Sequence, residues 1–183
     1  MLDVIYMNTL PDTDEFGVIF KELPCTNVLV NPNRRQVNDL LSASTNRLLI
    51  CGHGDECGVY GEPEIVNTRI CWGGHVLDRS HAELLRRREV IGIWCYAGNF
   101  ADNHGLHGFF TSMFISNTNE AADFGFKTDA KTVSDENVFF AKAVRHLVEN
   151  GVPLSEWVWT LQHTAHTDIP FVRFNYEALA YYE

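Results

Sequence analysis

Short apolar runs, separated by segments with helical spacing, constrain the fold of this chain more than any other feature. Three runs are continuous in aliphatic residues: Asn27–Val30, Arg47–Cys51 and Val90–Trp94. Runs this short and this apolar are typical of strands that are buried on both faces of a parallel sheet. Val4–Met7 and Ser112–Ser116 predict two further strands.

The segments between these runs carry helix signals. The pattern predicts a helix after the cap at Asn31–Asn33, one from Val76 through Arg88, one over Asn137–Glu149, and one opening at Pro153–Trp157. Strands that alternate with helices predict an α/β fold with a mostly parallel central sheet flanked by helices. The length of 183 residues favours one domain, residues 1–183, with a sizeable core.

Charge and composition exclude several classes of function. The formal net charge is −10 and the one compact basic run is Arg86–Arg88, so we expect no nucleic-acid binding. No apolar stretch approaches the roughly 20 residues that span a bilayer, so we expect no membrane insertion. The start of the chain has no basic region before an apolar core, and the cysteines are odd in number, five in all. These features predict reduced thiols and a cytoplasmic location.

Two of the expected strands end in residues that carry chemistry. One continues as Cys51-Gly52-His53-Gly54, and the other as Cys95-Tyr96-Ala97-Gly98. Reactive groups in open parallel sheets collect beyond the carboxyl ends of the strands. We therefore expect the imidazole of His53 and the thiol of Cys95 to meet at one edge of the sheet.

A thiol and an imidazole at one edge are the components of a nucleophilic site. The imidazole accepts the thiol proton or lowers the thiol pKa, and the sulfur then attacks a carbonyl carbon. Backbone N–H groups stabilise the oxyanion that forms. The amides of Gly54 and Cys95 are the candidates for this role if both loops face one pocket. Taken singly, a cysteine in a strand is often a small core residue and a histidine between glycines a loop residue.

The two motifs resemble those of the caspase-like cysteine peptidases, which include caspases, legumain, gingipain, clostripain, separase and the CHAT-type peptidases. The likeness covers roughly residues 28–125. It implies a caspase-like three-layer sandwich, with His53 as general base or thiol-orienting group, Cys95 as nucleophile and Gly54 as an oxyanion-hole amide. It also implies a protein or peptide substrate, a thioester intermediate and neither a cofactor nor a metal.

The chain departs from this family at two points. Trp94 stands where many members have a small or acidic residue, and the caspase signature Gln-Ala-Cys-x-Gly is absent, so a caspase proper is not expected. The family also includes inactive members. An alternative is therefore a catalytically inactive caspase-like module that binds a partner protein through its aromatic C-terminal region.

Glu120 and Asp123 follow the fifth expected strand and are candidate substrate-binding residues. Their carboxylates could pair with a basic side chain of a substrate. The alternative is that both are solvated residues of a short helix, where the helix dipole favours acidic side chains near the start.

Zinc binding is a further alternative, carried by Cys51, His53 and Cys57 with Cys71 and His75 downstream. Their spacing matches no standard finger or ribbon, and a cysteine inside a strand usually faces the core. His163 and His166 form a second pair without a third ligand in sequence, which favours a surface role.

Overall fold

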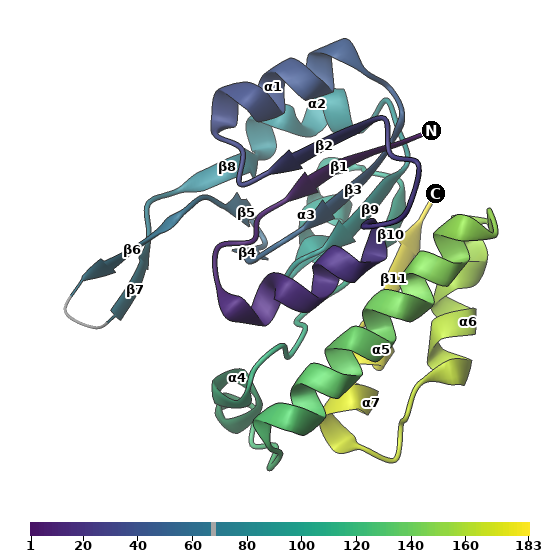
Figure 1. Ribbon diagram of the computed structural model, residues 1–183. Coiled ribbons are helices and arrows are strands. Elements are labelled where there is room, and N and C mark those ends of the chain that lie inside the picture. The colour runs from purple at the N-terminus through teal and green to yellow at the C-terminus, as the bar shows by residue number, and fades with distance from the viewer. Residues whose placement is uncertain (67–68) are drawn as a thin grey trace.

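The computed structural model describes residues 1–66 and 69–183, and its centre is a six-stranded sheet (Figure 1). The strand order is β11-β10-β9-β3-β1-β2. Five of these strands are parallel to their neighbours and β11 runs antiparallel to β10. The bounds are β1 Leu2–Tyr6, β2 Asn27–Val30, β3 Arg47–Cys51, β9 Val90–Ile93, β10 Gly108–Phe110 and β11 Ala180–Tyr182.

Helices cover both faces of this sheet. One face carries α1 Arg34–Ala43, α2 Ala82–Leu85 and α3 Ala97–His104; the other carries the 3-10 helix η1 Pro11–Ile19 with α5 Ala130–Glu149, α6 Trp157–Thr164 and α7 Pro170–Glu177. Strand β3 shows why both faces need helices. Leu48 and Ile50 pack into the core on the side of α1, α2 and α3, whereas Leu49 and Cys51 pack into the core on the side of α5. The prediction of an α/β fold with a mostly parallel sheet is confirmed.

Local signals set several of the helix ends as predicted. Asn33 caps α1: its side chain accepts the N–H of Gln36, while the Gln36 side chain accepts the N–H of Asn33. The helix predicted over Asn137–Glu149 begins seven residues earlier, at Ala130, because Asp129 caps it there. The helix predicted after Pro153 begins as the 3-10 turn η3 Leu154–Glu156 and continues as α6.

The helix predicted from Val76 is wrong in its first part. Val76 and Leu77 lie in the strand β8, His75–Asp78, and only Ala82–Leu85 is α-helical. β8 pairs with β5 Gly58–Tyr60, which pairs with β4 Gly54–Asp55. The strands β6 Pro63–Val66 and β7 Arg69–Trp72 form a hairpin that extends away from the sheet at the left of Figure 1.

The strand predicted at Ser112–Ser116 is also wrong. The fifth parallel strand is β10, which ends at Phe110, and the segment that follows is an irregular loop. Asn175 on α7 satisfies the backbone of this loop, since its amide donates to the Ile115 carbonyl and accepts the Ile115 N–H. A side chain therefore replaces a neighbouring strand as the hydrogen-bond partner.

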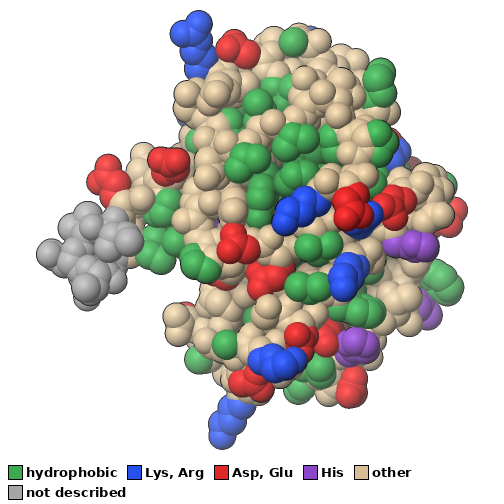
Figure 2. Space-filling model, viewed as in Figure 1, with side chains coloured by type: hydrophobic (Ala, Val, Ile, Leu, Met, Phe, Trp, Pro, Cys, Tyr) green, Lys and Arg blue, Asp and Glu red, His purple; other side chains and the backbone are tan. Residues whose placement is uncertain are grey.

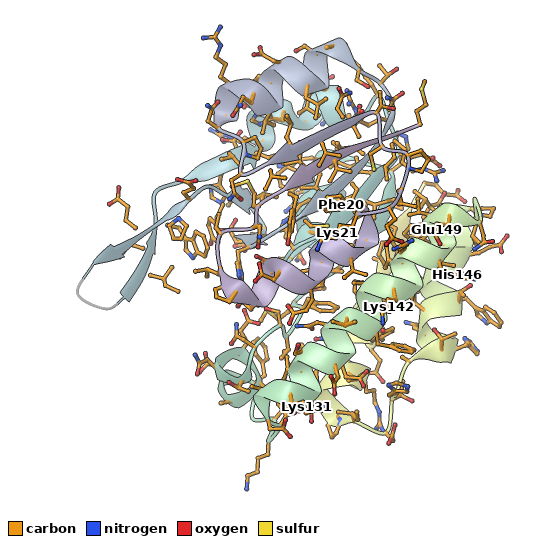
Figure 3. All side chains as sticks on the ribbon, viewed as in Figure 1. Phe20, Lys21, Lys131, Lys142, His146 and Glu149 are labelled. Carbon is orange, nitrogen blue, oxygen red and sulfur yellow. The ribbon has the colours of Figure 1, made fainter. Side chains whose placement is uncertain are left out.

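The surface facing the viewer combines an apolar edge with a charged helix face. Hydrophobic side chains gather over β2 in the upper part of Figure 2, where Val28 and Val30 are exposed. Along α5 the lysines are exposed, and Lys131, labelled at the start of this helix in Figure 3, pairs with Asp135 one turn later. Within the two ranges described, every helix is too short or too polar to cross a membrane.

Candidate active site

His53 and Cys95 line one cavity at the carboxyl edge of the sheet, where the parallel strands predict them. β3 and β9 are adjacent, with Cys51 opposite Ile93, and each candidate residue follows two positions later. Both side chains line one small cavity of about 10 Å³, together with residues from η1 and from the loop after β10. The topology thus brings the two residues to one place.

The backbone turns sharply directly after Cys95, through a residue in an energetically costly conformation. Tyr96, directly after it, has φ 64° and ψ 23°, in the left-handed region. An aromatic residue rarely adopts this conformation, and such outliers cluster at functional sites. The turn lets β9 end and α3 begin at Ala97, so Cys95 lies between a strand end and a helix start.

The thiol of Cys95 is held in its neutral form. Its Sγ donates a hydrogen bond to the Phe114 carbonyl at 3.6 Å, and the residue is partly buried. Burial raises the pKa of the Cys95 thiol to about 12, and the nearby carboxylate of Glu120 acts in the same direction. Attack by this sulfur therefore needs a base that removes its proton.

His53 is oriented by a carboxylate that sequence reasoning missed. Its Nε2 lies 2.9 Å from Oδ1 of Asp12, and the amide of Asn117 donates to Oδ2 of Asp12 at 2.7 Å. Burial opposes the charged form, but the hydrogen bonds from His53 and Asn117 hold the pKa of Asp12 below its usual value. Because a carboxylate only accepts, Nε2 carries the proton, and Nδ1 of a neutral His53 ring is left as the acceptor.

The helix η1 brings Asp12 to this position. The hydroxyl of Tyr6, at the end of β1, donates to the Thr13 carbonyl at 2.7 Å. Phe16 packs edge-on against Phe114 and Phe140, and α5 covers the outer side of η1. Asp12 is separated from His53 by two strands, β2 and β3, and the helix α1, so no local pattern in the sequence links the two.

Glu120 faces the site, whereas Asp123 lies outside it. The N–H and hydroxyl of Ser116 donate to Oε2 of Glu120 at 2.7 and 3.0 Å. Burial raises the pKa of Glu120 above its usual value, and the charge of Asp12 adds to this effect. Asp123 is exposed at the end of α4, Thr118–Asp123. A substrate-binding role stays a prediction for both.

Gly54 opens β4 opposite Val59. The Tyr60 N–H donates to the His53 carbonyl, which makes that pair hydrogen-bonded, so the alternation of an antiparallel ladder directs the Gly54 N–H away from β5. A Cβ at Gly54 would lie 2.5 Å from the ring of Trp94. Close packing against the Gly58 carbonyl and Trp94 thus accounts for the glycine, and the oxyanion-hole role of Gly54 stays a prediction.

A stack of rings covers the outer side of His53. Trp72 from β7 lies 5.4 Å from the His53 ring and stacks on Tyr60 at 4.8 Å, and Tyr60 stacks on His75 at 5.0 Å. Asp55 fixes this stack, since its carboxylate accepts from the Tyr60 hydroxyl and pairs with His75. The base of the projecting hairpin therefore forms an aromatic wall beside the site.

The structure separates the cysteines considered for zinc. Cys51 is fully buried in the core, whereas Cys57 and Cys71 are exposed. Of the two histidines near the C-terminus, His163 contacts the Trp159 carbonyl and His166 pairs with Glu136, so each has its own partner. Among the described residues, the group able to hold a metal ion is instead Asp12, His53 and Glu120.

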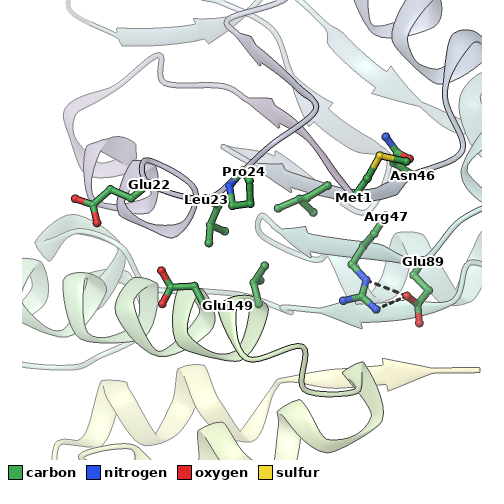
Figure 4. A pocket seen from close by; sticks show the side chains of 10 residues that line it. Met1, Glu22, Leu23, Pro24, Asn46, Arg47, Glu89 and Glu149 are labelled. Carbon is green, nitrogen blue, oxygen red and sulfur yellow. Dashed lines mark hydrogen bonds and ion pairs between the residues drawn. The ribbon is translucent and has the colours of Figure 1, made fainter.

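A much larger cavity, about 580 Å³, lies at the opposite edge of the sheet, around the starts of β1 and β3 (Figure 4). The charged side chains that line it already have partners, one of which, Arg145, lies outside the lining. Arg47 binds Glu89, and Arg145 binds Glu22 and Glu149. This cavity therefore offers volume without a reactive group.

Comparison with known proteins adds no relative from which a role could be carried over. No family model matches the chain, and neither curated proteins nor solved structures show a significant match to it.

Proposed function

We propose that this protein is a caspase-like cysteine peptidase, or a related amide hydrolase, with Cys95 as nucleophile and His53 as general base. One observation carries the proposal: the two side chains follow adjacent parallel strands and line the same cavity. The likeness of both motifs to the caspase-like peptidases supports it. The carboxylate of Asp12 adds a positioning residue that holds the imidazole.

The hydrogen bond to Asp12 defines the path of the proton. Nδ1 of His53 accepts the thiol proton as the Cys95 sulfur attacks the carbonyl carbon of an amide. The tetrahedral intermediate collapses, the C–N bond breaks, and the imidazolium returns the proton to the leaving amine. Water then hydrolyses the thioester. Because the Cys95 pKa lies far above neutrality, the base acts during attack rather than on a preformed thiolate.

Substrate binding requires the site to open. A cavity of about 10 Å³ holds at most about one water molecule, not a peptide bond. The hydrogen bond from Cys95 to the Phe114 carbonyl must also break. The loop that carries Phe114 and Ser116 lines the cavity and is the wall to move. A preference for a basic side chain beside the cleaved bond is part of the proposal, with Glu120, which faces the site, as its carrier.

The closed cavity favours a second candidate, an inactive caspase-like module. A buried thiol bonded to a backbone carbonyl is also what a structural cysteine shows. In this case the protein would act by binding a partner protein. Only the first candidate would cleave peptides, and the next experiment measures this cleavage.

A peptide library with a mass readout separates the candidates. We expect cleavage by the wild-type chain and none by Cys95→Ser or His53→Ala. His75→Ala is the matched control, because His75 also pairs with an aspartate, Asp55, but lies away from Cys95 at the outer end of the aromatic stack. Equal cleavage by wild type and Cys95→Ser, or none by a folded wild type, would overturn the hydrolase proposal.

A further inference from the structure

The carboxylates of Asp12 and Glu120 flank His53 closely enough to share a ligand. One donor atom from each of the three side chains lies within 4.8 Å of the other two. They reach this point from η1, from the start of α4 and from the end of β3. In the described part of the chain, neither carboxylate forms an ion pair with a lysine or arginine.

The donor set suits a small, borderline-soft divalent cation. Zinc binds imidazole nitrogen and carboxylate oxygen at about 2.0–2.2 Å, which places tetrahedral ligands about 3.3 Å apart. The three donors therefore need to close in by no more than about 1.5 Å, within the reach of side-chain rotation. The side chains of His53 and Asp12 are only 13% and 17% exposed, so water competes weakly for an ion held there. Magnesium and calcium prefer sites made of oxygen alone.

His53 belongs both to this group and to the cavity that Cys95 lines, and the charges of Asp12 and Glu120 act on the Cys95 thiol. A tetrahedral ion on three protein ligands keeps one position open for water or another ligand. The carboxylates are oriented in advance, because Asn117 holds Asp12 and Ser116 holds Glu120.

We infer that Asp12, His53 and Glu120 bind Zn²⁺, and that the bound ion switches the site off. A neutral imidazole that ligates zinc through one ring nitrogen carries its proton on the other, so neither nitrogen of His53 can accept the thiol proton. The regulatory consequence rests on the proposed hydrolase function, whereas the binding itself does not.

Binding is measured directly, by competition between the protein and a chromophoric zinc chelator. The parent is the full chain with Cys57→Ser and Cys71→Ser, because both thiols are exposed and could collect zinc on their own. We expect one ion per chain. Asp12→Asn and Glu120→Gln, which keep the size of each side chain, should weaken the affinity by about tenfold or more.

The second histidine–aspartate pair supplies the matched control. Asp55 and His75 are 2.8 Å apart but lack a second carboxylate, so Asp55→Asn should leave the zinc affinity unchanged. Equal affinity in the parent and in Glu120→Gln, or loss of affinity in Asp55→Asn, would overturn the zinc site. Circular dichroism of each variant verifies that it is folded.

Cys95→Ala separates this inference from the proposed function. This variant loses hydrolysis but keeps its three zinc ligands, so its affinity should stay close to that of the parent. Zinc binding in a chain without hydrolytic activity would uphold the site and contradict the hydrolase. The rate of hydrolysis by the parent is also compared in micromolar zinc and in EDTA. Equal rates in the two conditions would contradict inhibition by zinc.

Discussion

The two edges of the central sheet differ in cavity volume and in reactive side chains, and the edge with the larger cavity is the one without reactive groups. The amino edge has the larger cavity, about 580 Å³, and its glutamates are paired with arginines. The carboxyl edge has a cavity of only about 10 Å³, but it holds a thiol, an imidazole and two carboxylates. The reactive side chains therefore lie at the edge that the strand direction indicates, not at the edge with the larger cavity.

The largest effect should come from removing the nucleophile. Cys95→Ser should lower kcat/KM for the best library peptide by about 10⁴-fold or more, as removal of a nucleophile does in comparable sites. Arg47→Ala, in the large cavity at the amino edge, should leave kcat/KM unchanged. A loss of similar size in Arg47→Ala would break the contrast between the two edges.

The second-largest expected effect is the pH dependence of the rate at which Cys95 is alkylated. With a Cys95 pKa of about 12, the thiolate fraction and the labelling rate should rise about tenfold per pH unit from pH 7 to 10, without levelling. Peptide mapping by mass spectrometry separates Cys95 from the other cysteines. A plateau near neutral pH would indicate a preformed thiolate–imidazolium pair instead.

The same shift has a consequence for stability. The folded thiol has the higher pKa, so the unfolded chain loses this proton first as the pH rises. The contribution of Cys95 is therefore complete below the ordinary thiol pKa of about 8.5 and is lost as the pH rises toward 12.

Asp12→Asn should lower kcat/KM by about 100-fold. An asparagine amide can donate to Nε2 of His53, which would place the ring proton on Nδ1 and remove the acceptor for the thiol. Asp55→Asn, at the other histidine–aspartate pair, is the matched control and should have little effect. Similar losses in both variants would show that general destabilisation, rather than the tautomer, lowers the rate.

Gly54→Ala should destabilise the protein by about 1–3 kcal/mol, because the new Cβ would lie 2.3 Å from the Gly58 carbonyl and 2.5 Å from the Trp94 ring. Gly73→Ala is the control, since its Cβ would meet its nearest neighbour at 3.9 Å. Urea denaturation measures both. Equal midpoints for the two variants would contradict the packing given for Gly54.

The smallest effect tests the strain beside Cys95. Tyr96→Gly should be about 1 kcal/mol more stable than Tyr96→Ala, because glycine adopts the left-handed conformation without a Cβ clash. Both variants lose the ring, so the difference isolates the backbone. A less stable glycine variant would show that the conformation at Tyr96 stores no strain.

The sequence could predict that His53 and Cys95 come to the same edge of the sheet, because their placement there depends on local patterns. The apolar runs of β3 and β9 predict parallel strands, and parallel strands bring the residues that follow them, His53 and Cys95, to one edge. Helix α1 could also be predicted, because its capping residue and the spacing of its apolar residues are local features of the sequence.

The remaining features depend on contacts between distant segments. Asp12 reaches His53 only because Tyr6 and α5 hold η1 in place. Val76 and Leu77 fit a helical pattern, but pairing with β5 makes them a strand. The apolar segment around Ile115 is a loop because Asn175, 60 residues away, bonds to its backbone. Such tertiary partners leave no local signal.

The central claim, that His53 and Cys95 act as a pair, is tested most directly by the rate at which a peptide acyloxymethyl ketone modifies Cys95 near neutral pH in the presence of EDTA. The pair predicts a rate at least about 100-fold lower in His53→Ala than in wild type, with His75→Ala unchanged. Equal rates in wild type and His53→Ala would contradict the account, as would modification of Cys57 or Cys71 alone.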